Sequence, residues 1–256
     1  MTASALTDPA FTMPPVPDGG PRDGIRWLRG TVARFADGQA HQRRRLHVTG
    51  MLARADVTAL RAAAAAATRA VFDSGHPVDV LAQVAPVVPV EVLAEALDMP
   101  PVPVHHVAAA AAAYQPGGDS ADAQADNAVA HLVTVFGGVP DESTAARIGV
   151  LVQAHTATAC LIGNVARTLP RAPGLPADAL VARTLRLAPP VRTTRRLDTG
   201  TGAVVTVDLA ARRLPFGAGP HECPGRDHAV AIAEGVVETL LECPMWTISA
   251  GARRSR

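Results

Sequence analysis

Phe216–Gly225 has the sequence FGAGPHECPG, and this stretch decides how the rest of the chain is interpreted. Three glycines and two prolines among these ten residues predict a tight, irregular loop. Cys223 lies near its end, directly before the helical pattern DHAVAIAEGVVETLL (227–241). A thiol at a helix start faces free backbone N–H groups and the positive end of the helix dipole, and both favour the thiolate. The thiolate would be a good axial ligand for heme iron, and a buried structural cysteine is the alternative.

The same ten residues resemble the heme-binding loop of the cytochrome P450 family, F-x-x-G-x-[H/R]-x-C-x-G, at every specified position. The resemblance implies heme b (iron protoporphyrin IX) as cofactor and Cys223 as the ligand of its metal. It also implies that Phe216 shields the sulfur and that Gly219 and Gly225 let the backbone approach the cofactor. His221 would reach a heme propionate, and a surface histidine is the alternative.

Two other segments resemble the family's remaining propionate donors. His41 and Arg45 are four residues apart in FADGQAHQRRRLHV, so they share one face of a predicted helix. Two donors on one face can clamp one pair of carboxylates, and a solvated basic face is the alternative. Arg196 matches the third propionate partner, with Arg195 as the neighbouring alternative.

Residues 143–164 resemble the family's central helix, which crosses the distal face of the heme. The family usually carries an acid followed by Thr there, but this register places Thr156 and Ala157 at those positions. A shift by one residue would place Ala157 and Thr158 there, again without a carboxylate. The remaining polar candidates for catalysis are Gln153, His155 and Thr156. The threonines could instead bond to the carbonyl four residues back.

Residues 181–196 resemble the family's E-x-x-R helix and the strand after it, but Arg183 stands where the Glu belongs, before Arg186. The long meander that normally precedes the cysteine is almost wholly missing. So are the N-terminal helix and sheet strands, much of the helix pair over the substrate, and the C-terminal hairpin. The resemblance therefore covers most of this chain but only part of the family's fold.

Apolar residues make up 48% of the chain and aromatic residues only 3%, which favours close-packed helices. Helices are expected over 24–37, from about 39, over 56–72 with Asp56 as N-cap, within 78–98 after a short extended piece, over 104–114, to about 136, over 143–169, over 177–187 and over 225–242. Loops are expected over 1–24 and 115–122, and 203–208 carries the clear strand signal. We expect one mainly α domain over residues 1–256: a reduced cytochrome P450-like helical fold with a minor β element.

The resemblance implies a bacterial-type heme-thiolate enzyme, a monooxygenase or peroxygenase that oxidises a small molecule in secondary metabolite biosynthesis. Electrons would come from a ferredoxin-type donor. Because the acid–Thr pair is missing, one alternative is heme chemistry without a monooxygenase step: peroxide-dependent oxidation, dehydration, isomerisation or bond formation. Another is a non-catalytic accessory subunit. The shortened frame favours self-association or a partner enzyme.

Charge and patterning exclude several classes. A net charge of +1 argues against a nucleic-acid binder. Charged residues, Gly and Pro interrupt every apolar run, so no transmembrane helix is expected, and the N-terminus lacks a secretory pattern.

The cysteines, histidines and arginines add further expectations. Three cysteines at unrelated spacings predict no disulfide framework and a cytoplasmic location, with Cys160 in the core. The adjacent His105 and His106 predict no metal pair. The arginines expected to form either a docking surface for an acidic redox partner or a scattered solvated set are Arg43, Arg44, Arg212, Arg213 and Arg226.

Overall fold

The computed structural model describes residues 3–115, 122–243 and 245–249, and most of them are helical. The helices are α1 (Ile25–Thr31), α2 (Gly38–Leu52), α3 (Val57–Phe72), α4 (Val88–Ala96), α5 (Val104–Tyr114), α6 (Ala123–Val135), α7 (Glu142–Thr168), α8 (Ala177–Leu187) and α9 (Arg226–Glu242). The strands are β1 (Phe11–Thr12), β2 (Val78–Asp79), β3 (Thr193–Asp198), β4 (Val204–Asp208) and β5 (Trp246–Thr247). β1, β3 and β4 form one antiparallel sheet in that order, and β2 pairs with β5 in parallel.

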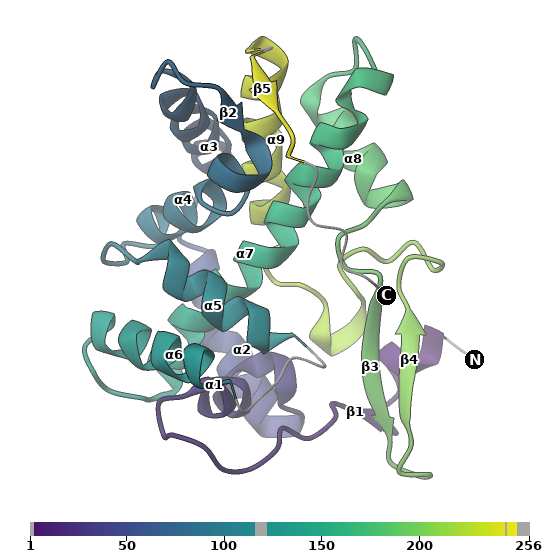
Figure 1. The fold of residues 1–256 in the computed structure, drawn as a ribbon. Coiled ribbons are helices and arrows are strands. Elements are labelled where there is room, and N and C mark those ends of the chain that lie inside the picture. Colours follow the sequence, from purple (N-terminus) through teal and green to yellow (C-terminus); the bar gives the residue numbers. More distant parts are fainter. Residues whose placement is uncertain (1–2, 116–121, 244, 250–256) are drawn as a thin grey trace.

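The central element is α7, which Figure 1 shows crossing the middle of the molecule. The Asp141 side chain begins it by accepting a hydrogen bond from the Thr144 N–H at 2.8 Å. α7 packs against α2, α4, α5, α8 and α9. Its buried apolar residues, Leu151 and Ile162 among them, belong to the main core. The long helix predicted over 143–169 is therefore confirmed, and it provides one wall for the space beside it.

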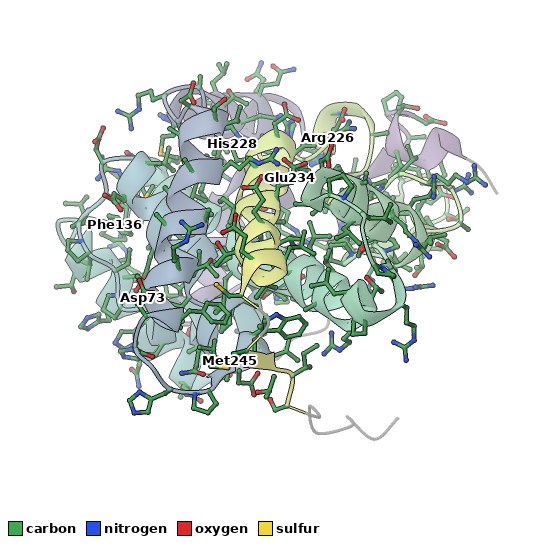
Figure 2. The ribbon with its side chains drawn as sticks, turned by 90° about the horizontal axis from the view of Figure 1, so that it is seen from above. Asp73, Phe136, Arg226, His228, Glu234 and Met245 are labelled. Atoms are coloured by element: carbon green, nitrogen blue, oxygen red, sulfur yellow. The ribbon has the colours of Figure 1, made fainter. Side chains whose placement is uncertain are left out.

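α9 follows the loop of residues 216–225, here called the cysteine loop, and lies along α3 (Figure 2). The two helices approach closely at Gly235, where any Cβ atom would collide with the Arg61 carbonyl oxygen. Arg61 also pairs with Glu234 at 2.7 Å, and the Thr239 hydroxyl donates to the Ala65 carbonyl at 3.0 Å. These contacts fix the position at which the cysteine loop enters α9.

The helices predicted over 56–72, 104–114 and 177–187 are confirmed to within one residue. Asp56 caps α3 by accepting from the Ala59 N–H at 2.8 Å, as expected. The single helix predicted over 24–37 is wrong, because the chain turns extended at Val32 and continues as a short 3-10 turn, Ala33–Phe35. The Val32 side chain packs against α7 at Gly149, and this contact outweighs the helical spacing.

The β structure exceeds what the patterning predicted. β4 is confirmed, and β3 forms a hairpin with it. The segment predicted as loop over 1–24 contains a 3-10 turn, Ala3–Leu6, and the two-residue strand β1. β1 and β5 were missed because two-residue strands carry no alternation to detect. The predicted loop at 115–122 lies mostly outside the described residues.

One helix in the described part of the chain is long and apolar enough to cross a membrane by length and composition alone. It comprises α7 and the turn after it, Glu142–Arg171, and 56% of its most apolar window is buried inside the protein, as in a core helix. Cys160 was expected in the core but is exposed on this helix. Thr156, one turn earlier, is exposed on the same face.

Candidate functional site

A cavity lies between α7, α2, the cysteine loop and strand β3. The space that the centre of a water molecule can reach inside it is about 250 Å³, far more than the ~10–15 Å³ that one water needs on this measure. Its apolar wall includes Leu52, Leu161 and Ile232. Neither an aspartate nor a glutamate lines it among the described residues. The charged or titratable side chains of its wall are Arg34, His41, Arg45, Arg196, His221, Cys223 and His228.

The cysteine loop brings Cys223 into the cavity wall. The Cys223 N–H donates to the Phe216 carbonyl at 2.9 Å, which closes the loop on itself. Phe216 also lines the cavity, and the Arg226 guanidinium lies 5.3 Å from the centre of its ring. Figure 2 labels Arg226, which begins α9, with His228 on the same helix. The sulfur and the aromatic ring that was predicted to shield it thus lie on one wall.

The structure reverses the expected protonation of this thiol. Burial raises the pKa of Cys223 above its usual value, and this outweighs the hydrogen bond from Gly225 that favours the thiolate. α9 begins only at Arg226, so the first turn of the helix does not contain the sulfur. The surroundings of Cys223 within the protein therefore favour the thiol over the thiolate.

The two glycines of the loop motif occupy different places. Gly225 lines the cavity. Gly219 does not, and its positive φ of 73° together with its contact explains the residue differently. A Cβ atom there would lie 2.5 Å from the Leu6 carbonyl oxygen, so Gly219 allows the N-terminal turn to pack on the loop. Within the protein, Gly219 thus approaches the backbone at Leu6, and its approach to a cofactor stays a prediction.

The structure brings the four predicted propionate donors to one side of the cavity. The rings of His41 and His221 lie 4.2 Å apart, and Arg45 and Arg196 line the same space. Burial, with His41 and Arg196 adding positive charge, lowers the pKa of His221 to about 4. Asp37 opposes this shift from 3.4 Å, while its other oxygen accepts from the Met13 N–H. Burial also lowers the pKa of His41, with Arg45 adding to this effect as a positive charge and Asp37 opposing it.

Arg196 is the strongest anomaly of the cluster, because only 4% of its surface is exposed. Burial lowers its pKa, and no carboxylate of the described residues lies within ion-pair distance. Within the described residues, its guanidinium donates to the Arg195 carbonyl at 2.9 Å and to the Thr194 hydroxyl at 3.1 Å. Arg195 is exposed, because successive side chains of a strand point to opposite faces. Of the two arginines considered as the third propionate partner, Arg196 is therefore the one that lies at the cavity.

α7 presents a different set of polar residues from the one expected. Gln153 and the buried Thr158 line the cavity, together with Ala154 and Ala157. Thr156 is exposed and lies outside the cavity wall, because neighbouring helical positions point about 100° apart. His155 is also outside that wall, and both of its ring nitrogens are buried without a hydrogen-bond partner. The structure thus matches the register shifted by one residue, with Thr158 at the cavity.

Two cavity residues were missed. His228 shares a hydrogen bond at 2.9 Å with the Leu52 carbonyl, and Arg34 lies in the 3-10 turn before α2. His228 could have been found by its place on the first turn of α9, whereas Arg34 carries no motif signal.

The predicted basic docking surface carries less free positive charge than its sequence suggests. Arg43 and Arg44 both bind Glu142, at 2.8 and 2.9 Å, so their charge is partly neutralised.

The helix carrying Arg183 and Arg186 is confirmed as α8, and both arginines are exposed. Neither makes an ion pair among the described residues. The chain passes from β4 to the cysteine loop within a few residues, Leu209–Pro215. The described residues therefore contain neither the Glu–Arg pair of an E-x-x-R helix nor a long meander before the cysteine.

The sequence matches no protein-family model and no curated protein. Solved structures are similar in fold at low identity. P450BioI, in complex with acyl carrier protein ligated to hexadec-9Z-enoic acid, is 17% identical with a TM-score of 0.75, covering 94% of this chain and 82% of that one. Mycobacterium smegmatis CYP164A2 with econazole bound is 21% identical, with a TM-score of 0.69 over 93% and 81%. CxnD, a cytochrome P450 for C–S bond formation in chuangxinmycin biosynthesis, is 16% identical, with a TM-score of 0.69 over 94% and 77%. The helical arrangement around α7 is therefore the cytochrome P450 fold, in a shortened form.

Proposed function

We propose that this chain binds heme b in the cavity between α7 and the cysteine loop, with Cys223 as the axial ligand of the iron. The observation that carries the proposal is the donor set. One thiol lies in the cavity wall together with Arg45 and the buried Arg196, and no carboxylate of the described residues lines that wall. Heme carries an iron that accepts a thiolate and two propionates that accept guanidinium and imidazole donors. On heme, the iron would therefore bind the thiolate, and the propionates would pair with the positively charged side chains of the cavity.

His41, Arg45, Arg196 and His221 would hold the propionates, and Phe216 and Gly225 would border the sulfur. The negative propionates would offset the buried charge of Arg196, and would raise the lowered pKa values of the two histidines. When bound, heme supplies redox chemistry at its iron. The chain's own residues exclude water through the apolar wall and orient the substrate, with the Thr158 hydroxyl and the Gln153 amide as the polar groups on α7.

On this basis we propose the oxidation of a small organic molecule in a biosynthetic pathway, with a ferredoxin-type protein as electron donor. The fold is that of the cytochromes P450, which supports an oxidoreductase in general terms. Thr158 replaces Thr156 as the candidate that holds or moves a proton at its hydroxyl oxygen. His155 is withdrawn from the catalytic set because its ring lies outside the cavity wall.

A second candidate function is favoured by one observation, the lack of a carboxylate on the cavity wall of the described residues. Delivery of protons by a positioned acid contributes about 10²–10⁴-fold to such reactions. Hydrogen peroxide already carries the two protons that reduction of dioxygen to the same level would consume, while dehydration, isomerisation and bond formation can proceed without activation of dioxygen. The similar fold of CxnD, which serves C–S bond formation, supports the inclusion of bond-forming chemistry.

The proposal is tested by loading the purified chain with one equivalent of hemin and supplying thioanisole as a probe. One arm receives hydrogen peroxide, and the other receives dioxygen with a reduced ferredoxin. Sulfoxide formed in the ferredoxin arm supports the monooxygenase, and sulfoxide formed with peroxide alone supports the second candidate. The control is Cys160→Ala, which removes an exposed thiol outside the cavity and should match the native chain.

Three outcomes contradict the proposal or a part of it. A chain that takes up no heme has no such cofactor site. Heme uptake with equal sulfoxide from the native chain and from Cys223→Ala shows chemistry that does not depend on the proposed ligand. Heme uptake without product in either arm rejects the oxidation proposed here and favours an accessory subunit that assembles with a partner enzyme or a second copy.

A further inference from the structure

Arg34 is a cation of the cavity wall that the proposed heme site does not use. It lies in the 3-10 turn Ala33–Phe35, between α1 and α2, and its side chain is half-buried. None of the ion pairs among the described residues involves Arg34. The other arginines of the wall, Arg45 and Arg196, belong to the proposed propionate donors. Arg34 is thus a charged donor at the cavity without an assigned partner.

Two aromatic rings hold the Arg34 guanidinium in place. Its central carbon lies 5.7 Å from the centre of the Phe35 ring and 5.6 Å from that of Tyr114. The two rings pack edge to face at 5.2 Å, and Tyr114 is fully buried. Stacking on aromatic faces orients a guanidinium and leaves its N–H donors free for a planar anion. The side chain is therefore positioned but not neutralised.

A second cation borders the same aromatic pair. The central carbon of the Arg29 guanidinium lies 4.9 Å from the centre of the Phe35 ring. Burial lowers the pKa of Arg29, and Arg34 adds to this effect as a like charge. The Arg29 Nε and the Tyr114 Oη are both buried without a hydrogen-bond partner in the described part of the chain. The group thus concentrates positive charge beside the cavity, and no ion pair of the described residues involves Arg29 or Arg34.

We infer that Arg34 binds the carboxylate of an organic acid that enters the cavity with an apolar body, and so selects acidic substrates. This inference rests on the proposed function, because it names the substrate class of that site. The carboxylate would accept from the guanidinium fork of Arg34, with Arg29 behind it strengthening the positive field. The apolar body would lie against Ala154, Ala157 and Leu161 of α7, which line the same cavity.

The test compares an acid with its neutral ester. The heme content of the native chain and of Arg34→Gln is measured first, and calorimetric titrations with decanoate and with methyl decanoate follow. We expect both chains to hold equal heme and the native chain to prefer decanoate. Arg34→Gln should bind decanoate about 10–100-fold more weakly, as for one charged hydrogen-bonded contact, and methyl decanoate equally well. Arg34→Lys should fall between them, because it keeps the charge but not the fork.

Arg22→Gln is the matched control, since it removes an exposed arginine outside the cavity and should bind decanoate like the native chain. Equal loss of decanoate affinity in this variant would reduce the effect to net charge and overturn the inference. Loss of heme in Arg34→Gln would make Arg34 a propionate donor and overturn it too. If the native chain takes up no heme, the proposed function fails separately. The calorimetric preference for the acid, and its loss in Arg34→Gln, then still support or reject the role of Arg34.

Discussion

At the scale of single residues, Arg196 shows a conflict between stability and binding. A buried cation without an acidic partner destabilises the heme-free fold, because its lost hydration is not compensated. Substitution by Met at this position should therefore raise the free energy of unfolding of the heme-free chain by about 1 kcal/mol or more. The same substitution should weaken heme binding about 10–100-fold, since a charged hydrogen bond to a propionate is lost.

Thermal unfolding of the heme-free chain and a hemin titration measure these two effects of Arg196→Met. Arg195→Met is the control, because Arg195 is the exposed neighbour on the same strand and should change neither quantity. An Arg196→Met chain that is less stable without heme and binds heme as before would show that Arg196 has a purely structural role.

Sequence reasoning found the residues of the cofactor site better than those of its distal side. The cysteine loop and the spacing of His41 and Arg45 are local patterns, and the structure brings them to one cavity. The register of α7 is different, because no charged residue marks which face meets the cavity. Thr156 and Thr158 carry the same chemistry, and only packing places one outside and the other inside.

At the scale of elements, the approach of α3 and α9 sets the entry of the cysteine loop into its helix. Gly235→Ala would place a methyl group against the Arg61 carbonyl oxygen and push the two helices apart. We expect a loss of about 1–3 kcal/mol in the free energy of unfolding, measured with urea. Gly50→Ala in α2 is the control, because no atom lies near its added Cβ. It should stabilise the protein by up to about 1 kcal/mol through helix propensity. Equal stability of the two variants would contradict the close approach of α3 and α9.

The contact between α2 and α7 predicts a pH dependence. Hydrogen bonds from Arg43 and Arg44 lower the pKa of Glu142 from 4.5 to about 2. A depressed carboxyl pKa stabilises the fold above the unfolded value near 4.5, and this contribution is lost as the pH falls towards 2. Glu142→Gln should therefore cost about 1 kcal/mol at pH 7, discounted for solvent exposure.

The cost of Glu142→Gln should shrink between pH 4.5 and pH 2. Urea unfolding of both chains across this range measures it. The control is the same substitution in a chain that carries Arg43→Gln and Arg44→Gln, where the loss of both donors should remove the pH dependence. A difference between native and Glu142→Gln chains that stays constant with pH would contradict the ion pair.

Most elements were predictable because their limits are local. Asp56 and Asp141 cap helices through their own side chains, and Pro and Gly end several others. The break at Val32 was not predictable, since it depends on Gly149 more than a hundred positions later. Strand β1 likewise exists only through its pairing with β3.

At the scale of the whole molecule, the shortened fold keeps a cavity beside its central helix α7, part of which is exposed. The arginines of the cavity wall come from two segments distant in sequence: Arg34 and Arg45 from the 3-10 turn before α2 and from α2, and Arg196 from β3. On α7, Thr156 and Cys160 face solvent. A ligand that binds only the folded chain stabilises it by mass action, so heme should raise the melting temperature of this protein.

The most direct test of the central claim is the absorption spectrum of the hemin-loaded chain after reduction and exposure to carbon monoxide. The thiolate-ligated complex has a strongly red-shifted Soret band, and we predict this band for the native chain and for Cys160→Ser. Cys223→Ser should retain heme through the propionate donors but lose the shifted band. A native chain without the band, or a Cys223→Ser chain that keeps it, would contradict the assignment of Cys223 as the heme ligand.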